Sequence, residues 1–318
     1  MRIDRNFAVG MFTAFSVFMS PILDAHSGWR EDVGVFKIGI VSGKNKSNAA
    51  KFVEPFRVAL QEEISMPVKV FVAENYRALI NAQTSEKVHY AVHSASSFAA
   101  TWSKCGCIEP LAAAKLSSGS IEYYSILIVK KDRISNIAEL KGKRIAVSGK
   151  NSLSGYIIPK HELHDKELRF VDSPSEVDDT VIVNAGSAAN SRKLFQADLV
   201  DGLFGWSTMN GVVNSGYSAG SLVDLIGHRD VSMNDLRVIW KSKPIYAGPH
   251  TITSKVPENI KNSISEFLLQ LYEKNPQAYD SIENYEGGGF AKVELANYQP
   301  LIDFVSAKDD APVSAENK

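Results

Sequence analysis

The residues best suited to chemistry lie in one short stretch, Gly149–Gly155, which holds two serines separated by one residue. Ser152 and Ser154 stand where a strand-like segment gives way to a helix-like one. Helix N-termini attract anions because unpaired N–H groups and the helix dipole meet there, and serine hydroxyls add further donors. Serines in this position also cap helices. The stretch therefore indicates either a site for a tetrahedral oxyanion or a helix cap, and the two interpretations are about equally favoured.

Part of this stretch also occurs earlier in the chain. The five residues Val41–Asn45 recur unchanged as Val147–Asn151. Each copy follows a strand-like segment and precedes a helix-like one. The shared placement suggests two similar lobes, each presenting a helix N-terminus from the same edge.

Two further patterns have chemical interpretations. Gly216–Gly220 matches the G-x-S-x-G pattern of serine hydrolases, which would make Ser218 a nucleophile. That motif needs a buried strand before it, whereas 207–214 is typical of a polar helix, so a secreted hydrolase is the weaker interpretation. His161 and His164 lie three residues apart on an expected helix, but two ligands do not make a metal site. We expect surface histidines there, with no metal and no cofactor.

The chain has two cysteines, Cys105 and Cys107, with one residue between them. A disulfide across so short a gap would close a small, strained ring. A thiol pair, a labile disulfide and a structural disulfide therefore all stay open. Metal binding would need further ligands at tetrahedral spacing, and the neighbouring sequence offers none.

The first 27 residues have the pattern of a secretory signal peptide. Arg2 and Arg5 precede an apolar run over Phe7–Met19, and small residues follow at Ala25–Ser27. The run is too short for a transmembrane helix, which needs about 20 apolar residues. We expect cleavage near Ser27 and a periplasmic protein. A short N-terminal anchor or a buried helix is the alternative, and no cysteine near the cleavage site suggests a lipid anchor.

The composition is that of an ordered globular protein. Of 318 residues, 44% are hydrophobic and 22% are charged, which excludes a mainly disordered chain. The formal net charge of −1 gives no reason to expect a nucleic-acid partner. The length suggests about two domains.

Strand-like and helix-like segments alternate along the chain, which predicts an α/β fold. The expected strands are 35–41, 68–72, 90–92, 125–129, 144–147, 169–171, 202–206 and 236–240. The expected helices are 48–64, 76–82, 96–103, 136–140, 154–164, 188–199 and 257–272.

Several segments, taken in order, resemble one known family over about residues 34–305. They are Lys37–Ile40, Pro55–Phe56, Val72–Tyr76, Tyr123–Val129, Leu140–Ala146, Asn151–Tyr156, Val238–Ile245 and Phe290–Leu301. The chain resembles the phosphonate-binding periplasmic proteins, which are the solute receptors of ABC transporters for phosphate, phosphite and phosphonate. The resemblance implies the two-lobed type II periplasmic binding protein fold, with a ligand cleft between the lobes and a hinge of two crossing strands.

The resemblance also implies domain limits. The natural crossing points are 125–129 and 236–240. They assign 34–120 plus 240–305 to lobe 1 and 125–235 to lobe 2, and they leave 306–318 as a flexible tail. Hinge closure on the ligand is the expected motion.

Only some of the family's pocket residues are kept in this sequence. Tyrosines are kept at two positions, and the serines of an N-S-T-S-G-like motif are kept at two more. At other positions the family's threonine, histidine, glutamate and aspartate are replaced, and its usual Gly-Pro or Gly-Asn turn in lobe 1 is Ser94-Ala95. The expected ligand-binding residues are Tyr76, Tyr123, Ser152, Leu153, Ser154, Ser187 and Thr208, and the aspartate position is Gly248.

The implied function is that of a periplasmic, non-enzymatic receptor. It would bind phosphonate, phosphite or a phosphate-like oxyanion and deliver it to a membrane permease encoded as a separate chain. A periplasmic sensor module of the same fold and a secreted serine hydrolase are the alternatives.

Overall fold

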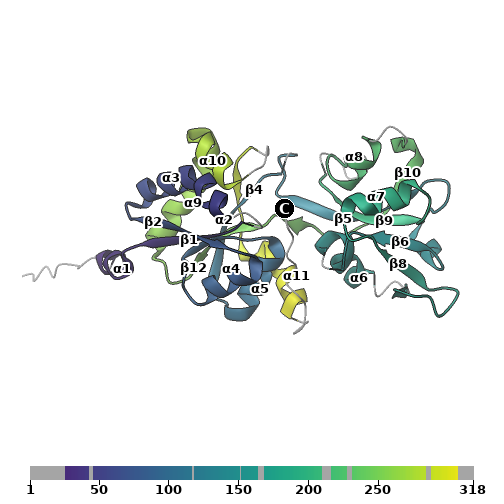
Figure 1. The fold of residues 1–318 in the computed structure, drawn as a ribbon, viewed down its shortest axis with the longest axis horizontal. Helices are drawn as coiled ribbons and strands as arrows, with labels where there is room; N and C mark the ends of the chain where they lie inside the picture. The colour runs from purple at the N-terminus through teal and green to yellow at the C-terminus, as the bar shows by residue number, and fades with distance from the viewer. Residues whose placement is uncertain are drawn as a thin grey trace, which may run out of the picture.

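The computed structural model describes residues 26–42, 46–116, 118–150, 152–163, 168–209, 216–227, 231–283 and 288–306. These residues form two α/β lobes that follow one another along the long axis of the molecule (Figure 1). The expected signal peptide up to residue 25, the tail from residue 307, and the residues Gly43–Asn45 and Asn151 of the repeated pentapeptide lie outside the described residues.

The first lobe is built on a mixed sheet with strand order β13-β4-β12-β3-β1-β2. Its described strands are β1 (Phe36–Val41), β2 (Val68–Ala73), β3 (Tyr90–Val92), β4 (Ile108–Ala114), β12 (Pro249–Thr253) and β13 (Phe290–Lys292). Its described helices are α1 (His26–Val33), α2 (Lys46–Phe52), α3 (Glu54–Ile64), α4 (Tyr76–Thr84), α5 (Ala95–Cys105), α9 (Glu258–Lys274), α10 (Pro276–Ile282) and α11 (Leu295–Ser306).

Apolar periodicity explains the core of this lobe. Helix α3 buries Phe56, Leu60 and Ile64, which repeat every four residues on one face. They pack in one cluster with Phe36 and Ile38 of β1, which are fully buried. Each such aliphatic or aromatic side chain contributes about 1.5–3 kcal/mol on burial.

The single helix expected over 48–64 is two helices, α2 and α3. Val53 separates them, and Pro55 is among the first residues of α3. Proline lacks an N–H group and fits the first turn of a helix rather than its interior, so it favours a new start.

The second lobe contains a sheet with order β10-β5-β9-β6-β8-β7, and β11 also pairs with β5. Its described strands are β5 (Glu122–Lys130), β6 (Arg144–Val147), β7 (Phe170–Val171), β8 (Thr180–Asn184), β9 (Gly202–Ser207), β10 (Leu236–Lys241) and β11 (Ile245–Tyr246). Its described helices and turns are η1 (Ile137–Leu140), η2 (Leu153–Ile157), α6 (Ile158–Glu162), α7 (Ala188–Gln196), α8 (Ser221–Ile226) and η4 (Met233–Asp235).

The two copies of the repeated pentapeptide begin at equivalent places. Val41 ends β1, which lies between the parallel strands β2 and β3. Val147 ends β6, which lies between the parallel strands β8 and β9. The two lobes therefore share a local topology around these strands, as the repeated pentapeptide predicts.

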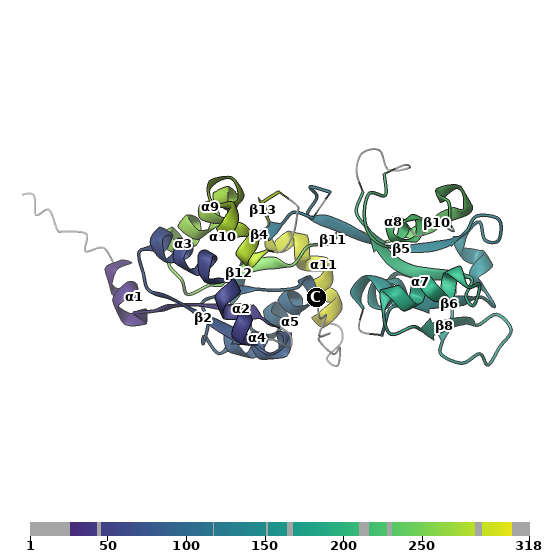
Figure 2. The same ribbon diagram turned by 45° about the horizontal axis from the view of Figure 1, so that its top comes forward.

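Two stretches of chain cross between the lobes, and both reach the same kind of sheet edge. The start of β5 pairs with the carboxyl end of β9, where Tyr124 lies opposite Ser207. The start of β12 pairs with the carboxyl end of β3, where His250 lies opposite Val92. Because β5 and β12 lead into the crossings, the hinge joins the carboxyl edges of the two sheets (Figure 2).

The crossing points differ in detail from those expected. The segments 125–129 and 236–240 pair with each other inside the second sheet. The chain crosses at their first-lobe ends, where Ser125 and Ser242 exchange hydrogen bonds: the Ser242 N–H donates to the Ser125 carbonyl (2.9 Å), and the Ser125 N–H donates to the Ser242 hydroxyl (3.0 Å).

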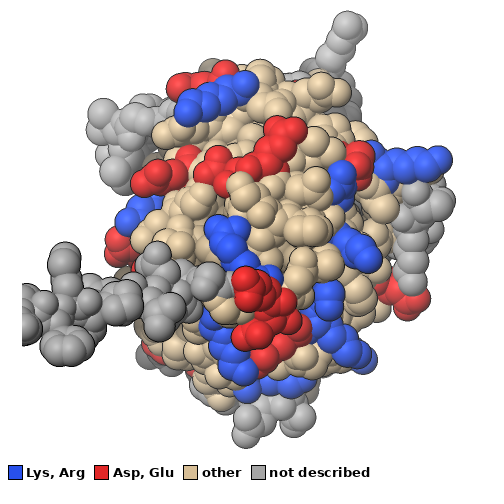
Figure 3. Space-filling view, turned by 90° about the vertical axis from the view of Figure 1, so that its left-hand side faces the viewer, with Lys and Arg blue, Asp and Glu red and all other residues tan. Residues whose placement is uncertain are grey.

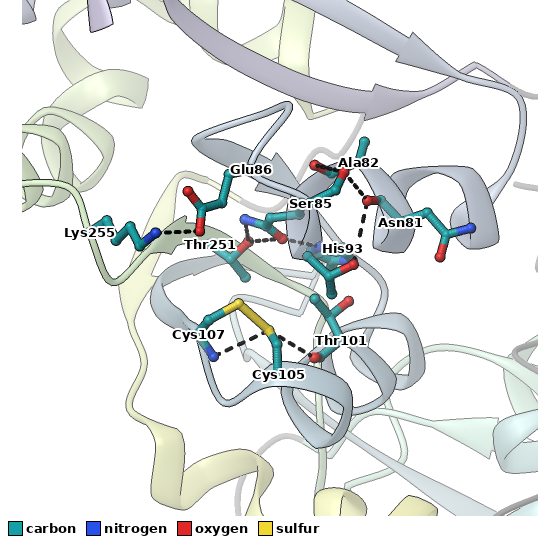
Figure 4. Close-up of a disulfide and its surroundings, with 12 residues drawn as sticks. Asn81, Ala82, Ser85, Glu86, His93, Thr101, Cys105, Cys107, Thr251 and Lys255 are labelled. Atoms are coloured by element: carbon teal, nitrogen blue, oxygen red, sulfur yellow. Dashed lines mark hydrogen bonds and ion pairs between the residues drawn. A yellow bond between two sulfur atoms is a disulfide. The ribbon is translucent and has the colours of Figure 1, made fainter. Parts of the chain in front are cut away.

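Cys105 and Cys107 form a disulfide at the C-terminal end of α5 (Figure 4). Gly106 between them has a φ of 56°, the left-handed conformation that ends many helices, and its N–H donates to the Trp102 carbonyl at 2.6 Å. Of the alternatives that the sequence leaves open, the structure has the bonded pair.

No helix within the described ranges is long and apolar enough to cross a membrane.

Candidate ligand-binding site

The serine-containing loop after β6 forms a tight turn. The hydroxyl of Ser152 accepts a hydrogen bond from the Gly155 N–H at 3.0 Å and so caps the π-helical turn η2. A Cβ at Gly155 would lie 2.7 Å from both the Ser148 and Ser152 hydroxyl oxygens. Glycine is therefore needed there, because both hydroxyl groups occupy the space that a side chain would take. Ser148 belongs to the repeated pentapeptide, but sequence reasoning did not single it out.

The two residues after Ser152 differ in environment. Leu153 is 3% exposed and lies in an apolar cluster, so its side chain does not face an aqueous cleft. Ser154 is half-buried, and its carbonyl accepts a hydrogen bond from the Ser125 hydroxyl on β5. This bond fixes the loop to the strand that leads into the hinge.

Ser187 lies at the same edge of the second sheet. It follows β8, whose last residue Asn184 lies beside Val147 of β6. The Ser187 hydroxyl caps α7 by accepting from the Asn190 N–H at 3.2 Å. The caps of η2 and α7 therefore follow neighbouring parallel strands, which is where open α/β sheets bind ligands.

Thr208 directly follows β9, the third strand at this edge. It is fully buried, and its hydroxyl lies 2.9 Å from the Ser218 hydroxyl. Trp206 on the same strand is 36% exposed, and the ring of Tyr123 meets it edge-on with the centroids 6.1 Å apart. Tyr123, Ser152, Ser187 and Thr208 are thus brought to one sheet edge.

In the first lobe, Tyr76 is the first residue of α4, just beyond the carboxyl end of β2. Asn75 caps the helix by accepting from the Ala78 N–H at 2.9 Å. Tyr76 is 8% exposed and packs with Leu79 and Ala91. Since the hinge joins the carboxyl edges of both sheets, Tyr76 belongs to the edge that adjoins that of Ser152.

A network of buried polar side chains lies next to Ser94, the residue that caps α5. The Ser97 hydroxyl lies 2.9 Å from His93 Nδ1, and His93 Nε2 lies 2.7 Å from Gln83 Oε1. Gln83 Nε2 in turn donates to the Thr251 hydroxyl at 3.0 Å. Burial lowers the pKa of His93 to about 3, so the imidazole is neutral near pH 7. Sequence reasoning missed this network, because its members come from three separate stretches of the chain.

Three charged side chains near the hinge and the serine loop each contact another side chain. Glu122 accepts a hydrogen bond from the Tyr124 hydroxyl at 3.2 Å, and Lys241 Nζ lies 4.4 Å from the centroid of the Tyr124 ring. Lys150, beside the serine loop, forms an ion pair with Asp172 at 2.7 Å between exposed side chains. Of these charged residues, Lys150 is nearest to Ser152 in the sequence, and Asp172 balances its charge.

Two surface cavities lie away from these residues. One of about 410 Å³ is lined by α3 and α9, and another of about 720 Å³ lies at the outer end of the second lobe beside Lys131 and Arg237. Within the described residues, no group of three or more His, Cys, Asp or Glu side chains is placed to hold a metal ion.

Comparison with known proteins identifies the family. Residues 38–298 match the family described as ABC transporter, phosphonate, periplasmic substrate-binding protein. The chain belongs to this family. Its members are solute-binding components of ABC transporters, so the chain is a solute-binding protein and not an enzyme.

One relative agrees with this assignment, and two solved structures share the fold. The phosphonates-binding periplasmic protein of Escherichia coli K12 is 26% identical over 284 residues, which are 87% of this chain and 76% of the relative. XAC2383 from Xanthomonas citri, solved bound to ATP, is 16% identical with a TM-score of 0.63, covering 86% of this chain and 98% of that chain. PhnD1 from Prochlorococcus marinus, solved with methylphosphonate, is 16% identical with a TM-score of 0.54, covering 85% and 97%. The expected two-lobed type II periplasmic binding protein fold is confirmed.

The serine-hydrolase interpretation does not survive the family assignment. Ser218 hydrogen-bonds to Thr208 rather than to a histidine, and its neighbour Tyr217 forms an isolated β-bridge with Met209. The segment 210–215 that precedes the motif lies outside the described residues.

Proposed function

We propose that this chain captures a small phosphorus oxyanion of the phosphonate class between its lobes and delivers it to the membrane permease of an ABC transporter. One observation carries the proposal. Ser152, Ser187, Thr208 and Tyr123 bring hydroxyl groups to one sheet edge, and Tyr76 lies at the adjoining edge of the other sheet. Hydroxyls beside helix N-termini suit a small anion, because they donate hydrogen bonds without a fixed charge.

The proposed ligand-binding set is the one expected from the sequence. It consists of Tyr76, Tyr123, Ser152, Leu153, Ser154, Ser187 and Thr208. Leu153 contributes through its backbone N–H, since its side chain lies in an apolar cluster. The names of the Escherichia coli relative and of the methylphosphonate complex support a phosphonate as the ligand.

Calorimetric titration with methylphosphonate tests this site. Ser152→Ala and Tyr123→Phe should each raise the dissociation constant by roughly ten- to hundredfold, because a hydrogen bond to a charged group contributes about 1.5–3 kcal/mol. Asn136→Ala is the matched control: Asn136 caps η1 by accepting from the Ala138 N–H, but it lies outside the proposed set. If both site variants bind as tightly as the parent, the residue assignment is wrong.

Transport, rather than sensing, is the proposed role of ligand capture. Cells that lack this chain should lose methylphosphonate uptake and regain it when the chain is restored. A sensor module of the same fold would change gene expression in response to methylphosphonate while uptake continued. Export is proposed through cleavage of the signal peptide near Ser27, and an intact Met1 on the periplasmic protein would contradict it.

We also infer that the lobes comprise 34–120 plus 240–305 and 125–235. Sheet membership supports the boundary between residues 120 and 125, because β5 begins the second sheet, but β10 (Leu236–Lys241) and β11 (Ile245–Tyr246) also pair with β5, so the second sheet continues past residue 235. Hydrogen exchange should then show two separately protected blocks with these boundaries. One block that spans residue 125 without a break would contradict them.

A further inference from the structure

The disulfide between Cys105 and Cys107 takes no part in the proposed ligand site. It lies at the C-terminal end of α5, and Ser94 caps the opposite end of that helix. Cys105 is exposed, whereas Cys107 is half-buried and packs against an apolar cluster of the first lobe. A thiol in solution can therefore reach the bond from the side of Cys105 without entering the ligand site.

The bond closes a loop of only three residues. A disulfide stabilises a fold by restricting the unfolded chain, and this effect grows with the length of the closed loop. Folding and reduction form a thermodynamic cycle, so the fold protects the disulfide against reduction by the same free energy. For a three-residue loop this protection is below about thirtyfold in the reduction equilibrium, whereas a loop of about 100 residues gives more than about a thousandfold.

Backbone hydrogen bonds hold the turn that carries the two cysteines. The Gly106 N–H donates to the Trp102 carbonyl at 2.6 Å, and the Ser254 N–H donates to the Cys107 carbonyl at 2.9 Å. The first bond fixes the end of α5, and the second fixes Cys107 to the chain that follows β12. Neither hydrogen bond needs the S–S bond. The two sulfur atoms therefore stay close together after reduction, and the disulfide can form again.

Two groups beside the Cys105 sulfur suit the reduced state (Figure 4). Cys105 Sγ lies 3.4 Å from the Thr101 carbonyl oxygen, and the Cys107 N–H donates to this sulfur at 3.2 Å. In the disulfide, Cys105 Sγ carries no hydrogen and cannot donate to Thr101. After reduction, the Cys105 thiol can donate to that carbonyl and still accept from Cys107. Reduction therefore gains a hydrogen bond, and stabilisation of the reduced form makes a disulfide more oxidising.

Exposure and charge identify Cys105 as the sulfur that an external thiolate attacks. The apolar cluster covers part of Cys107, whereas Cys105 is open to solvent. Lys104 directly precedes Cys105, and its Nζ donates to the neutral Asn81 amide oxygen at 2.9 Å. The positive charge of this exposed lysine can therefore attract an anionic thiolate towards Cys105.

We propose that Cys105 and Cys107 form a reversible redox pair that oxidises dithiols by thiol–disulfide exchange. One thiolate of the dithiol attacks Cys105 Sγ, and Cys107 leaves as a thiolate that takes up a proton. The second thiolate of the dithiol then attacks the sulfur bonded to Cys105. This step releases the Cys105 thiolate, which is protonated in turn, and closes the dithiol into its own disulfide. Two electrons and two protons pass from the dithiol to the protein.

The equilibrium with glutathione is the first test, made on the full chain purified without reductant. Buffers of reduced and oxidised glutathione set the redox state, and alkylation of free thiols followed by mass spectrometry measures the reduced fraction. The sequence has two cysteines, so the added mass reports this pair alone. The reduction equilibrium constants of the folded chain and of the urea-unfolded chain should agree within about thirtyfold.

Oxidation of a dithiol is the second measurement. The folded, oxidised chain should convert one equivalent of dithiothreitol to its cyclic disulfide and gain two thiols. The double variant Cys105→Ser and Cys107→Ser is the control, and it should leave dithiothreitol reduced.

Two single variants test which sulfur reacts. Cys107→Ser leaves Cys105 as a free thiol, and Cys105→Ser leaves Cys107. With dithionitrobenzoate, an aromatic disulfide, folded Cys107→Ser should react about tenfold faster than folded Cys105→Ser, because Cys105 is the exposed sulfur beside a lysine. Unfolding both variants in urea should remove the difference.

Three results would overturn the redox pair. The first is protection of the folded disulfide by more than about thirtyfold over the unfolded chain, because the bond would then be a structural one. The second is a pair of free thiols in the chain purified without reductant. The third is equal reactivity of folded Cys105→Ser and Cys107→Ser. The inference does not rest on the proposed function, and none of these measurements uses methylphosphonate, so failure of the proposed function would leave their results unchanged.

Discussion

At the scale of single residues, His93 makes a prediction about acid stability. Burial holds its pKa at about 3, against about 6.5 in an unfolded chain. Between these values the unfolded state binds one more proton, so the stability that neutral His93 contributes is complete above pH 6.5 and declines as the pH falls towards 3. From pH 7 to pH 5 this group should cost about 2 kcal/mol of unfolding free energy.

Urea unfolding of the parent and of His93→Gln at both pH values measures this cost. The variant loses the titrating group, so the difference between pH 7 and pH 5 should shrink by about 2 kcal/mol even if the variant is less stable overall. An unchanged difference would show that His93 does not remain neutral in the folded protein.

Gly248 makes a second prediction at this scale, about space. A Cβ at this position would lie 2.0 Å from the His93 carbonyl oxygen and 2.8 Å from the Ser94 Cα, both backbone atoms that cannot easily move. Gly248→Ala should therefore lower the unfolding free energy by about 1–3 kcal/mol or more. Gly227→Ala is the control, because its nearest neighbour would be at 3.4 Å, and a loss as large there would refute the steric cause.

At the scale of elements, the short disulfide at the end of α5 has little chain to constrain. Stabilisation through the unfolded state grows with the length of the closed loop, and a three-residue loop gives below about 2 kcal/mol. The double variant Cys105→Ser and Cys107→Ser should therefore lose less than that in chemical denaturation. It should bind methylphosphonate as the parent does, since the bond lies at the opposite end of α5 from Ser94. A loss above about 3 kcal/mol would point to a larger structural role.

Elements with a strong periodic pattern were predictable, and elements defined by their neighbours were not. The strand β3 and the strand β6 fall on the predicted residues, and the long helix α9 lies within two residues of prediction. Strand β4 was missed because its sequence, IEPLAAA, contains a proline and three alanines with low strand propensity. It is a strand because β12 and β13 flank it on both sides.

The candidate site divides in the same way. Ser152 and Ser187 could be found from sequence because a hydroxyl at a helix N-terminus is a local signal. The burial of Leu153 against the cluster of α11 depends on residues far along the chain, and no local pattern reveals it. The pairing of Thr208 with Ser218 likewise depends on a return of the chain towards β9.

At the scale of the whole molecule, the surface agrees with the small net charge. Figure 3, which views the end of the first lobe, shows acidic and basic side chains interspersed over that face rather than a patch of one sign. A mixed surface gives no long-range attraction for a polyanion such as nucleic acid. The net charge and this face therefore give no reason to expect a polyanionic ligand.

The ligand preference is the last prediction, and it follows from two positions. An aminoalkylphosphonate carries an ammonium group, which is costly to bury without a carboxylate partner. The resemblance aligns acidic residues of the family with Thr208 and Gly248. Thr208 carries no charge and its hydroxyl is paired with Ser218, while Gly248 has no room for a side chain. Methylphosphonate and phosphite should therefore bind at least as tightly as 2-aminoethylphosphonate in calorimetric titrations.

If the amino compound binds more than about tenfold tighter, or about 1.4 kcal/mol, another carboxylate must receive the ammonium group. Glu122, at the start of β5 beside the hinge, is then the residue to replace, because Glu122→Gln removes its charge at nearly constant size. Under our prediction Glu122→Gln leaves the order of the three ligands unchanged.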